Sequence, residues 1–384
     1  MWTPSSPATT TCHSSGMTSS TTAGSTTTSW RRPRRDRPRV VPSTSSWVRT
    51  RYPANTVTLR RNRAGCRRPR STSSTDSKQV TAVSRVETDD AAESLAKELQ
   101  NFQEIAHQLL PEPGDVPKLR GVDVWGGTRP LTGAVGGDHI IYVDFKQRYD
   151  LDARIVRAEA KGQTSVVDGL RRCQRRAGIA VLDVSGHQMT DALLAAMMHQ
   201  AFLLGALYEL DRYGQITTRL FENLNTRLYR SSGAHKFVAL LYGEVSEDGT
   251  FRFLAAGQPF PRVFSYRENR FVTVEADRRL SAPPIGIQPS LNVIDRATNE
   301  SPFGFKEQYE VNEWALLGTG DILLLYTDGL SEHGDDRYFP DHVEALVRDV
   351  KDRTAREIYD AIQSDLLVFS PPADDITLVV VKRR

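Results

Sequence analysis

The sequence predicts an α+β fold in which strands and helices form separate layers. From Lys236 onward the apolar pattern changes from the three- and four-residue steps of helices to strand-type runs joined by short turns. Two helical segments, residues 190–214 and 216–230, interrupt the strands as a pair. Hairpin-linked strands separated by paired helices favour α+β layers over a doubly wound βαβ sheet.

The first 85 residues are predicted to be a disordered tail. Eighteen of the first thirty residues are Ser or Thr, and residues 1–75 contain 14 Arg and one acid, Asp36. Such a segment buries too little apolar surface to offset the entropy lost on ordering. A solvated tail is the simplest interpretation. A basic arm for nucleic acid or anionic lipid and a transit peptide are the alternatives.

Residues 86–112 are predicted to contain a helix that ends before Pro111. Its apolar residues recur at steps of three and four: Leu95, Leu99, Phe102, Ile105, Ala106 and Leu109. The stripe suits a regulatory helix that pairs with a second copy of the chain over residues 91–110. A helix that covers the core of the following domain is the alternative.

Residues 113–384 are predicted to form a single domain. A Gly-Gly turn leads into a strand at 135–145 with Asp138 at its head. The charged segment 146–177 is expected to be a solvated insertion, although its arginine cluster, residues 171–176, could instead contact phosphate. The next stretch, Gly178–Gly186, is a buried strand that ends in Asp183 and a Ser-Gly turn.

After the two paired helices, the C-terminal part is predicted to combine hairpins with short helices. The expected elements are hairpins at 236–259 and 262–275, a loop at 282–288, a buried strand at 321–329, helices at 341–350 and 354–369, and a last strand that ends at Lys382.

Composition narrows the class of protein. Three cysteines without a CxxC pair indicate a reducing compartment and exclude a disulfide scaffold or a cysteine-rich zinc module. The longest apolar stretch, residues 192–207, is shorter than the roughly 20 residues of a bilayer span. We therefore expect a buried helix in a cytoplasmic protein without membrane attachment. No P-loop, GxSxG elbow or strand-linked GxGxxG is present.

Three aspartates far apart in the sequence, Asp183, Asp328 and Asp374, lie at predicted strand ends. Carboxylate oxygens suit Mg²⁺, Mn²⁺ or Ca²⁺. Together they could hold two ions about 3.5–4 Å apart, the separation used in two-metal phosphate chemistry. Taken singly, each aspartate is better explained as a turn or helix cap. His187 could protonate a leaving group or make a structural hydrogen bond.

Six motifs carry a resemblance to a known family over residues 103–384. They are VGGD at 135–138, DVSGH at 183–187, AGQPFP at 256–261, PIG at 284–286, YTDGLSE at 326–332 and DDITLVVV at 374–381. In this order they resemble the metal-dependent type 2C (PPM) protein serine/threonine phosphatases, most closely the bacterial SpoIIE/RsbU-like branch.

The resemblance implies a four-layer αββα sandwich of two antiparallel sheets flanked by helices, with two Mn²⁺ or Mg²⁺ ions at one end. By this resemblance Asp183 would bridge the ions and Val184 would offer its carbonyl. Asp328 and Asp374 would bind one ion each or share one, and Asp138 would hold metal-bound water. Two further residues would shape the site: Gly329 and Asp375.

The resemblance also implies a reaction and partners. A metal-activated water would hydrolyse phosphoserine or phosphothreonine on a regulatory protein of the anti-sigma-factor-antagonist type, under an upstream sensor protein; nucleic acid is not expected. The chain departs from the family at Gln188 and Gln258, which motivates the alternative of a low-activity or inactive binding module. We expect Asp144 to fill the second acidic position of the first strand.

Overall fold

The structure is a computed structural model that describes residues 93–112, 114–186, 189–231, 236–291, 301, 303–315 and 317–384, all within the unit Ser73–Arg384. The predicted tail, residues 1–85, lies outside the described residues, and so do His187 and Gln188.

The strands of the described part form two sheets. Sheet A has the order β1-β11-β10-β6-β7 with antiparallel pairing throughout. Its strands are β1 (Val122–Arg129), β6 (Arg262–Ser265), β7 (Arg270–Phe271), β10 (Ile322–Tyr326) and β11 (Ile376–Arg383).

Sheet B has the order β2-β3-β4-β5-β8, with β9 also paired to β5. All its pairs are antiparallel except β5 with β8. Its strands are β2 (Asp138–Asp144), β3 (Arg176–Val184), β4 (Val238–Ser246), β5 (Phe251–Ala256), β8 (Ser281–Ala282) and β9 (Asn312–Trp314). The long central strands follow the predicted apolar runs.

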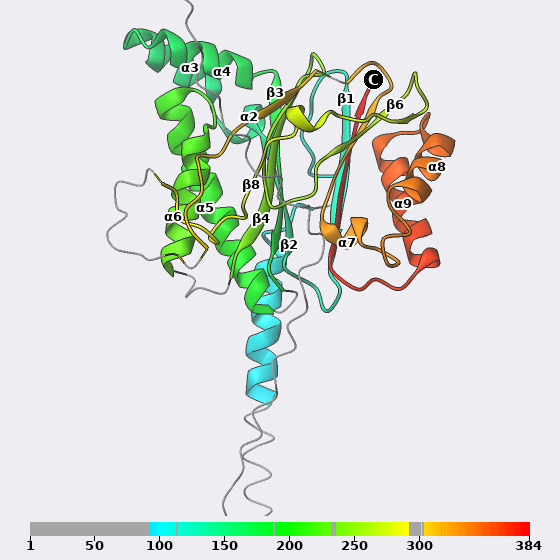
Figure 1. The fold of residues 1–384 in the computed structure, drawn as a ribbon. Coiled ribbons are helices and arrows are strands. Elements are labelled where there is room, and N and C mark those ends of the chain that lie inside the picture. Colours follow the sequence, from blue (N-terminus) through cyan, green and yellow to red (C-terminus); the bar gives the residue numbers. More distant parts are fainter. Residues whose placement is uncertain are drawn as a thin grey trace, which may run out of the picture. The chain divides into compact units, whose positions relative to one another are not determined.

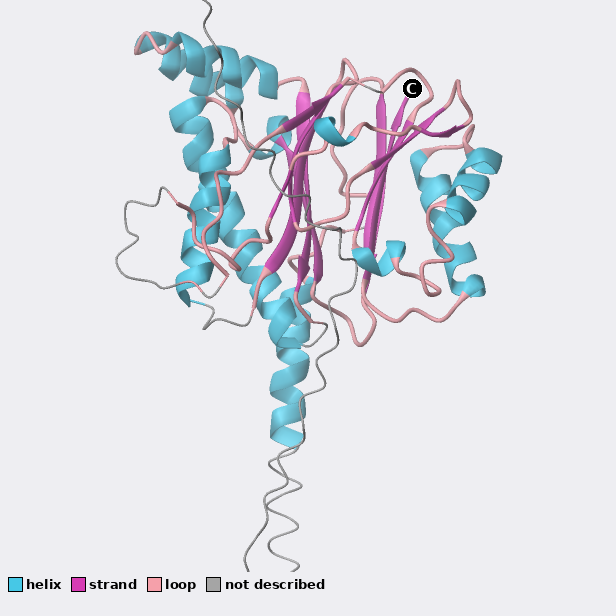
Figure 2. Ribbon diagram, viewed as in Figure 1, coloured by secondary structure: helices cyan, strands magenta, loops and turns pink. Residues whose placement is uncertain are grey.

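The two sheets pack face to face, and helices cover both outer faces (Figure 1 and Figure 2). Alternate residues of each strand fill the layer between the sheets, including Ile179 and Val181 of sheet B and Leu323 and Leu325 of sheet A. The helices on sheet B are α5 (Met189–Tyr213) and α6 (Thr218–Ser231), and those on sheet A are α8 (Asp341–Val350) and α9 (Ala355–Phe369). The predicted four-layer αββα sandwich is confirmed.

Local signals explain where several helices begin and end. Thr354 and Glu357 form a reciprocal capping box at the start of α9. The short helix α7 (Asp328–Ser331) follows β10 directly, and a 3-10 turn (Ala276–Arg278) precedes β8.

The segment 146–177 differs from the solvated insertion that was predicted. It forms α2 (Phe145–Arg148), α3 (Leu151–Ala160) and α4 (Thr164–Cys173). Val166 and Leu170 are buried against the helical side of sheet B. The charged residues lie on the outer faces of these helices, so the high charge hid an amphipathic pattern.

Helix α5 is only partly buried, which corrects the prediction of a buried helix. Ala195, Phe202 and Leu210 pack against sheet B, whereas Met197 and Tyr208 are exposed. By length and composition alone, residues Thr190–Tyr213 would also suffice to cross a membrane. The apolar composition of α5 therefore does not indicate which face of the helix packs against sheet B.

The predicted N-terminal helix is present over residues 93–107. Its Ala106 packs against Val135, in the turn before β2, and Ala192, in the first turn of α5. Leu95 and Leu99 are exposed.

Candidate functional site

Polar side chains replace the apolar ones at one end of the layer between the sheets. Since side chains alternate along a strand, Asp183 continues the inward row of Ile179 and Val181 in β3. Thr327 likewise follows the inward residues of β10, and Thr377 precedes those of β11. The two sheets thus bring polar groups together at the end where α7 begins (Figure 1).

Asp138 and Asp183 lie directly opposite each other on the paired strands β2 and β3. Opposite residues on one face of an antiparallel pair are in side-chain contact range. Asp138 is buried, and its Oδ2 accepts a hydrogen bond from Oγ1 of Thr327 at 2.7 Å. Thr327 Oγ1 in turn accepts from the backbone N–H of Thr377 at 3.0 Å. This chain of contacts joins Asp138 of sheet B to both central strands of sheet A.

Asp375 holds the turn that precedes β2. Its carboxylate accepts hydrogen bonds from the backbone N–H groups of Leu131 at 2.6 Å and Gly137 at 2.7 Å. Gly137 must be glycine, because a Cβ there would lie 2.9 Å from the carbonyl oxygen of Val184. The Gly-Gly-Asp turn therefore packs directly on the end of β3.

Burial and mutual repulsion disfavour the charged forms of these carboxyls. Burial, followed by the charge of Asp183, raises the pKa of Asp138 well above its usual value. Burial, with the charges of Asp328 and Asp374, raises the pKa of Asp183 to about 8. Burial, with the charge of Asp374, raises the pKa of Asp328 to about 6. The aspartates from four separate strand ends therefore form one electrostatically coupled cluster.

Two residues that sequence reasoning missed belong to the same region. Asp191, in the first turn of α5, is buried and contributes to the raised pKa of Asp183. Lys236 Nζ lies 2.5 Å from Asp191 Oδ1 and donates to the carbonyl of Ser185 at 2.9 Å. No local motif marks these residues, because the turn after β3 and the segment before β4 meet only in the folded chain.

The other site predictions have different outcomes. Val184 lies at the end of β3 beside Gly137 as described above, and His187 is outside the described residues. The prediction for Asp144 is wrong: it lies at the opposite end of β2 from Asp138 and caps α2 by accepting from the N–H groups of Lys146 and Gln147. Gln258 is buried, and its Nε2 donates to the carbonyl of Ala239 at 3.3 Å, a structural contact.

Whether the cluster suits a divalent ion can be judged from its donors. They are carboxylates and a backbone carbonyl, which suit hard cations such as Mg²⁺ and Mn²⁺. Within the described ranges, no three His, Cys, Asp or Glu side chains converge at metal-ligand spacing. Asp374 is exposed, and exposed side chains change rotamer on the picosecond-to-nanosecond timescale, so the position of its carboxylate is not fixed by packing. The donors fit in kind and location.

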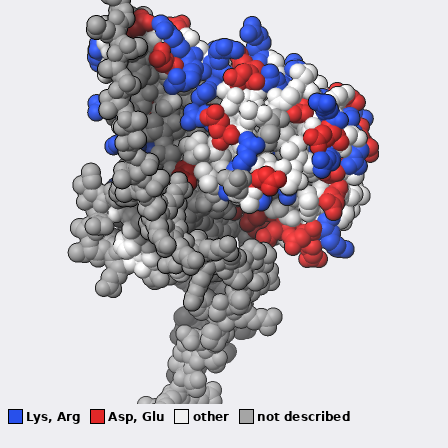
Figure 3. All heavy atoms as spheres, turned by 45° about the horizontal axis from the view of Figure 1, so that its top comes forward, with Lys and Arg blue, Asp and Glu red and all other residues white. Residues whose placement is uncertain are grey.

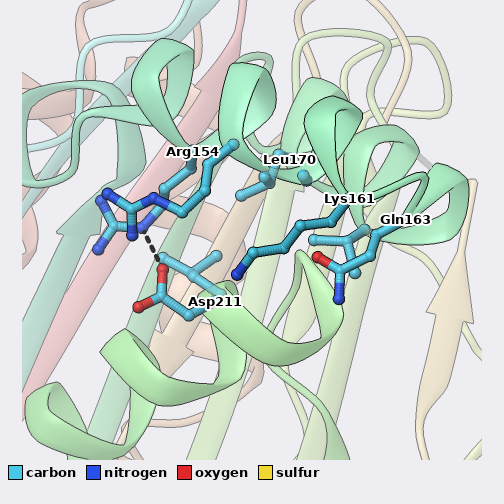
Figure 4. A pocket seen from close by; sticks show the side chains of 9 residues that line it. Arg154, Lys161, Gln163, Leu170 and Asp211 are labelled. Atoms are coloured by element: carbon cyan, nitrogen blue, oxygen red, sulfur yellow. Dashed lines mark ion pairs between the residues drawn. The ribbon is translucent and has the colours of Figure 1, made fainter.

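Away from the carboxylate cluster, a basic pocket lies between α3, α4 and the end of α5 (Figure 4). Arg154 and Lys161 line it, and Arg154 pairs with Asp211 at 2.9 Å. Asp211 and Asp191 lie near opposite ends of α5, which at 1.5 Å per residue places this pocket about 30 Å from the carboxylate cluster. It is therefore separate from the candidate site.

The arginine cluster at 171–176 makes structural contacts. Arg171 pairs with Glu159, Arg175 with Glu247 and Arg176 with Glu244. On the face shown in Figure 3, basic side chains lie among acidic ones. These ion pairs favour a structural role over the phosphate contact considered for this segment.

Comparison with solved structures shows the fold. The SiaA-PP2C domain of Pseudomonas aeruginosa matches with a TM-score of 0.51 and 15% identity, over 76% of this chain and 98% of that domain. The fold is therefore that of the PP2C phosphatases.

Two further structures match with lower scores. The RsbU and RsbW domains of a Mycobacterium tuberculosis protein give a TM-score of 0.47 at 21% identity, over 70% of this chain and 62% of that one. The PP2C phosphatase domain of SpoIIE from Bacillus subtilis, with a fragment of its regulatory domain, gives 0.46 at 17%, over 69% and 64%. The chain thus spans less than two thirds of the length of each.

The family follows from the sequence comparison. The family model for Stage II sporulation protein E (SpoIIE) matches residues 174–384, more than half of the chain. The chain belongs to the SpoIIE family, as the motifs predicted. The match includes Asp183, Asp328 and Asp374, whereas Asp138 lies before it. The comparison with curated proteins gave no match.

Proposed function

We propose that the chain is a divalent-metal-dependent phosphatase that hydrolyses phosphoserine or phosphothreonine on a regulatory protein. The observation that carries this proposal is the coupled carboxylate cluster at one end of a PP2C-type sandwich, with the pKa of Asp183 raised to about 8. Membership of the SpoIIE family supports a protein phosphatase. A phosphorylated anti-sigma-factor antagonist is the substrate that the motif resemblance implies.

The residues that would hold the ions are Asp138, Asp183, Asp328 and Asp374, with the carbonyl of Val184. When bound, divalent ions there would neutralise charge on the phosphate and lower the pKa of a water molecule. Asp183 would lose its proton as the ions bind, because metal binding requires the ionised carboxylate.

The residues around the cluster would hold it in place. Thr327 fixes the orientation of the Asp138 carboxylate, and Asp375 keeps the preceding turn in position. Lys236 offsets the negative charge of Asp191 beside the cluster. These contacts come from both sheets and would keep the donors aligned during turnover.

The helix at 93–107 offers a route for control by a partner protein. Ala106 contacts Val135, three residues before Asp138, and Ala192, next to Asp191. An upstream sensor, or a second copy of the chain, that moved this helix would therefore displace segments that carry residues of the cluster.

The test combines catalysis with metal binding. The wild-type protein should release phosphate from p-nitrophenyl phosphate and from a phosphoserine peptide only when Mn²⁺ or Mg²⁺ is present. Asp328→Asn should reduce this activity by at least about a hundredfold and weaken Mn²⁺ binding in calorimetry. Asp349→Asn, a change on the exposed surface of α8, is the control. Full activity of Asp328→Asn would refute the assignment of the site.

A further inference from the structure

A cavity of about 330 Å³ opens beside β6 and β10, apart from the carboxylate cluster. Its lining combines aromatic rings with two arginines and includes Phe260, Arg262, Arg279, Tyr326, Ser331 and Phe339. Phe260 belongs to the AGQPFP motif, which the candidate metal site leaves without a role. The volume is at the lower end of the range for ligand pockets and suits one or two side chains of a peptide.

The two arginines lie over aromatic rings of the cavity wall, at cation–π distance. The guanidinium carbon of Arg262 lies 5.9 Å from the ring centre of Phe339, and that of Arg279 lies 5.8 Å from that of Phe260. Among the described residues, neither arginine forms an ion pair with a carboxylate. A guanidinium stacked on a ring keeps N–H donors in its own plane, where they can bind a carboxylate.

Hydrogen bonds fix the inner wall of the cavity. The hydroxyl of Tyr326 donates to the carbonyl of Phe260 at 2.9 Å. Trp314 is buried, and its indole N–H donates to the carbonyl of Arg278 at 3.0 Å. A wall held in this way loses little conformational entropy when a ligand binds.

The short helix α7 connects this cavity to the candidate site. Ser331 lines the cavity, and its hydroxyl donates to the carbonyl of Asp328 at 3.3 Å. Four residues of helix are about 6 Å long. An extended peptide advances by roughly 3.3–3.6 Å per residue, so only a few residues are needed to reach from the cavity to the cluster.

We propose that this cavity docks an acidic segment of the phosphoprotein substrate, close in sequence to its phosphorylated residue. A carboxylate of that segment binds Arg262 and Arg279, and a neighbouring apolar side chain packs on Phe260 and Phe339. Charge complementarity selects this occupant, because two arginines that form no ion pair with a carboxylate among the described residues attract a carboxylate and repel a lysine. The inference rests on the proposed phosphatase function for its substrate class.

The test measures binding and catalysis separately. Two fluorescent phosphoserine peptides differ only in whether Asp-Leu or Lys-Leu pairs flank the phosphoserine. Fluorescence anisotropy without added metal gives their affinities for the wild-type protein, Arg262→Gln and Arg279→Gln. The control is Arg267→Gln, which removes an exposed arginine outside the cavity on the turn between β6 and β7.

The wild-type protein should bind the acidic peptide about tenfold more tightly than the lysine peptide. Each cavity variant should lose about five- to tenfold in affinity for the acidic peptide, and Arg267→Gln should lose none. With Mn²⁺, Arg262→Gln should lower kcat/KM for the acidic peptide through KM, by more than it lowers turnover of p-nitrophenyl phosphate.

Equal affinity for the two peptides, or equal losses in Arg262→Gln and Arg267→Gln, would overturn the proposal. If thermal melting shows that Arg262→Gln is misfolded, Arg279→Gln decides, since its side chain is exposed. If the wild-type protein discriminates between the peptides but hydrolyses neither them nor p-nitrophenyl phosphate, the phosphatase proposal fails and the docking site stands.

Discussion

The carboxylate of Asp375 accepts a hydrogen bond from the backbone N–H of Gly137 at 2.7 Å. This contact joins the residue before β11 to the turn before β2, so it links the two sheets at the end where the acidic cluster lies. A single side chain thereby positions the backbone that presents Asp138.

Asp375→Asn should weaken this link, because the amide has only one acceptor oxygen where the carboxylate offers two to Leu131 and Gly137. We expect a loss of about 1–3 kcal/mol in the free energy of unfolding and a lower kcat. Urea denaturation and phosphatase assays would measure both. Asp336→Asn, on an exposed loop, is the matched control and should leave both quantities unchanged. A variant as stable and active as the control would contradict this role.

Thr327→Val should leave the Asp138 carboxylate and the N–H of Thr377 without their common partner. Since both groups are buried, we expect a loss of about 1–3 kcal/mol in unfolding free energy. Thr327→Ser keeps the hydroxyl and should retain most of the stability. Thermal denaturation of the two variants makes the comparison, and equal melting temperatures would show that the hydroxyl is not needed.

Without divalent ions, the stability of the protein should fall between about pH 7 and about pH 8.5. The pKa of Asp183 is raised to about 8, above its unfolded value near 3.9, so the folded state holds more protons over this interval. Below about pH 6.5 the buried imidazoles of His139 and His199 make stability rise with increasing pH. Burial lowers their pKa values to about 3 and about 4, so the unfolded state binds more protons there than the folded state.

Melting temperatures in EDTA across this pH interval test the prediction. Asp183→Asn should flatten the slope, and saturating Mg²⁺ should raise stability most at the high-pH end, where the carboxylate is ionised. A slope that is unchanged in Asp183→Asn would assign the effect to other groups.

Lys236→Met should destabilise the protein by about 1–3 kcal/mol, because it removes the cation beside the buried carboxylate of Asp191. Lys236 is partly exposed, which keeps the expected cost below that of a fully buried pair. The double variant with Asp191→Asn should recover part of the loss. Urea denaturation of the wild-type protein, both single variants and the double variant measures the coupling energy between the two side chains. Additive losses would mean that the two side chains do not interact.

Local patterns were enough to predict separate strand and helix layers and three aspartates at strand ends, whereas the four-layer arrangement came from the resemblance to the phosphatase family. Continuous apolar runs typical of buried strands precede Asp183 and Asp328, and this pattern predicted both as strand-end carboxylates. These features depend on the hydrophobic pattern of a segment of about ten residues, which can be read from that segment alone.

Contacts between distant segments were decided only by the tertiary structure. Asp144 was expected at the acidic end of β2, yet it caps α2 at the other end, because the length of β2 separates it from Asp138. Lys236 reaches Asp191, and Arg262 reaches the ring of Phe339, only because the sheets and helices pack as they do. Pairings of this kind depend on the register and packing of elements far apart in the chain, and no local period encodes them.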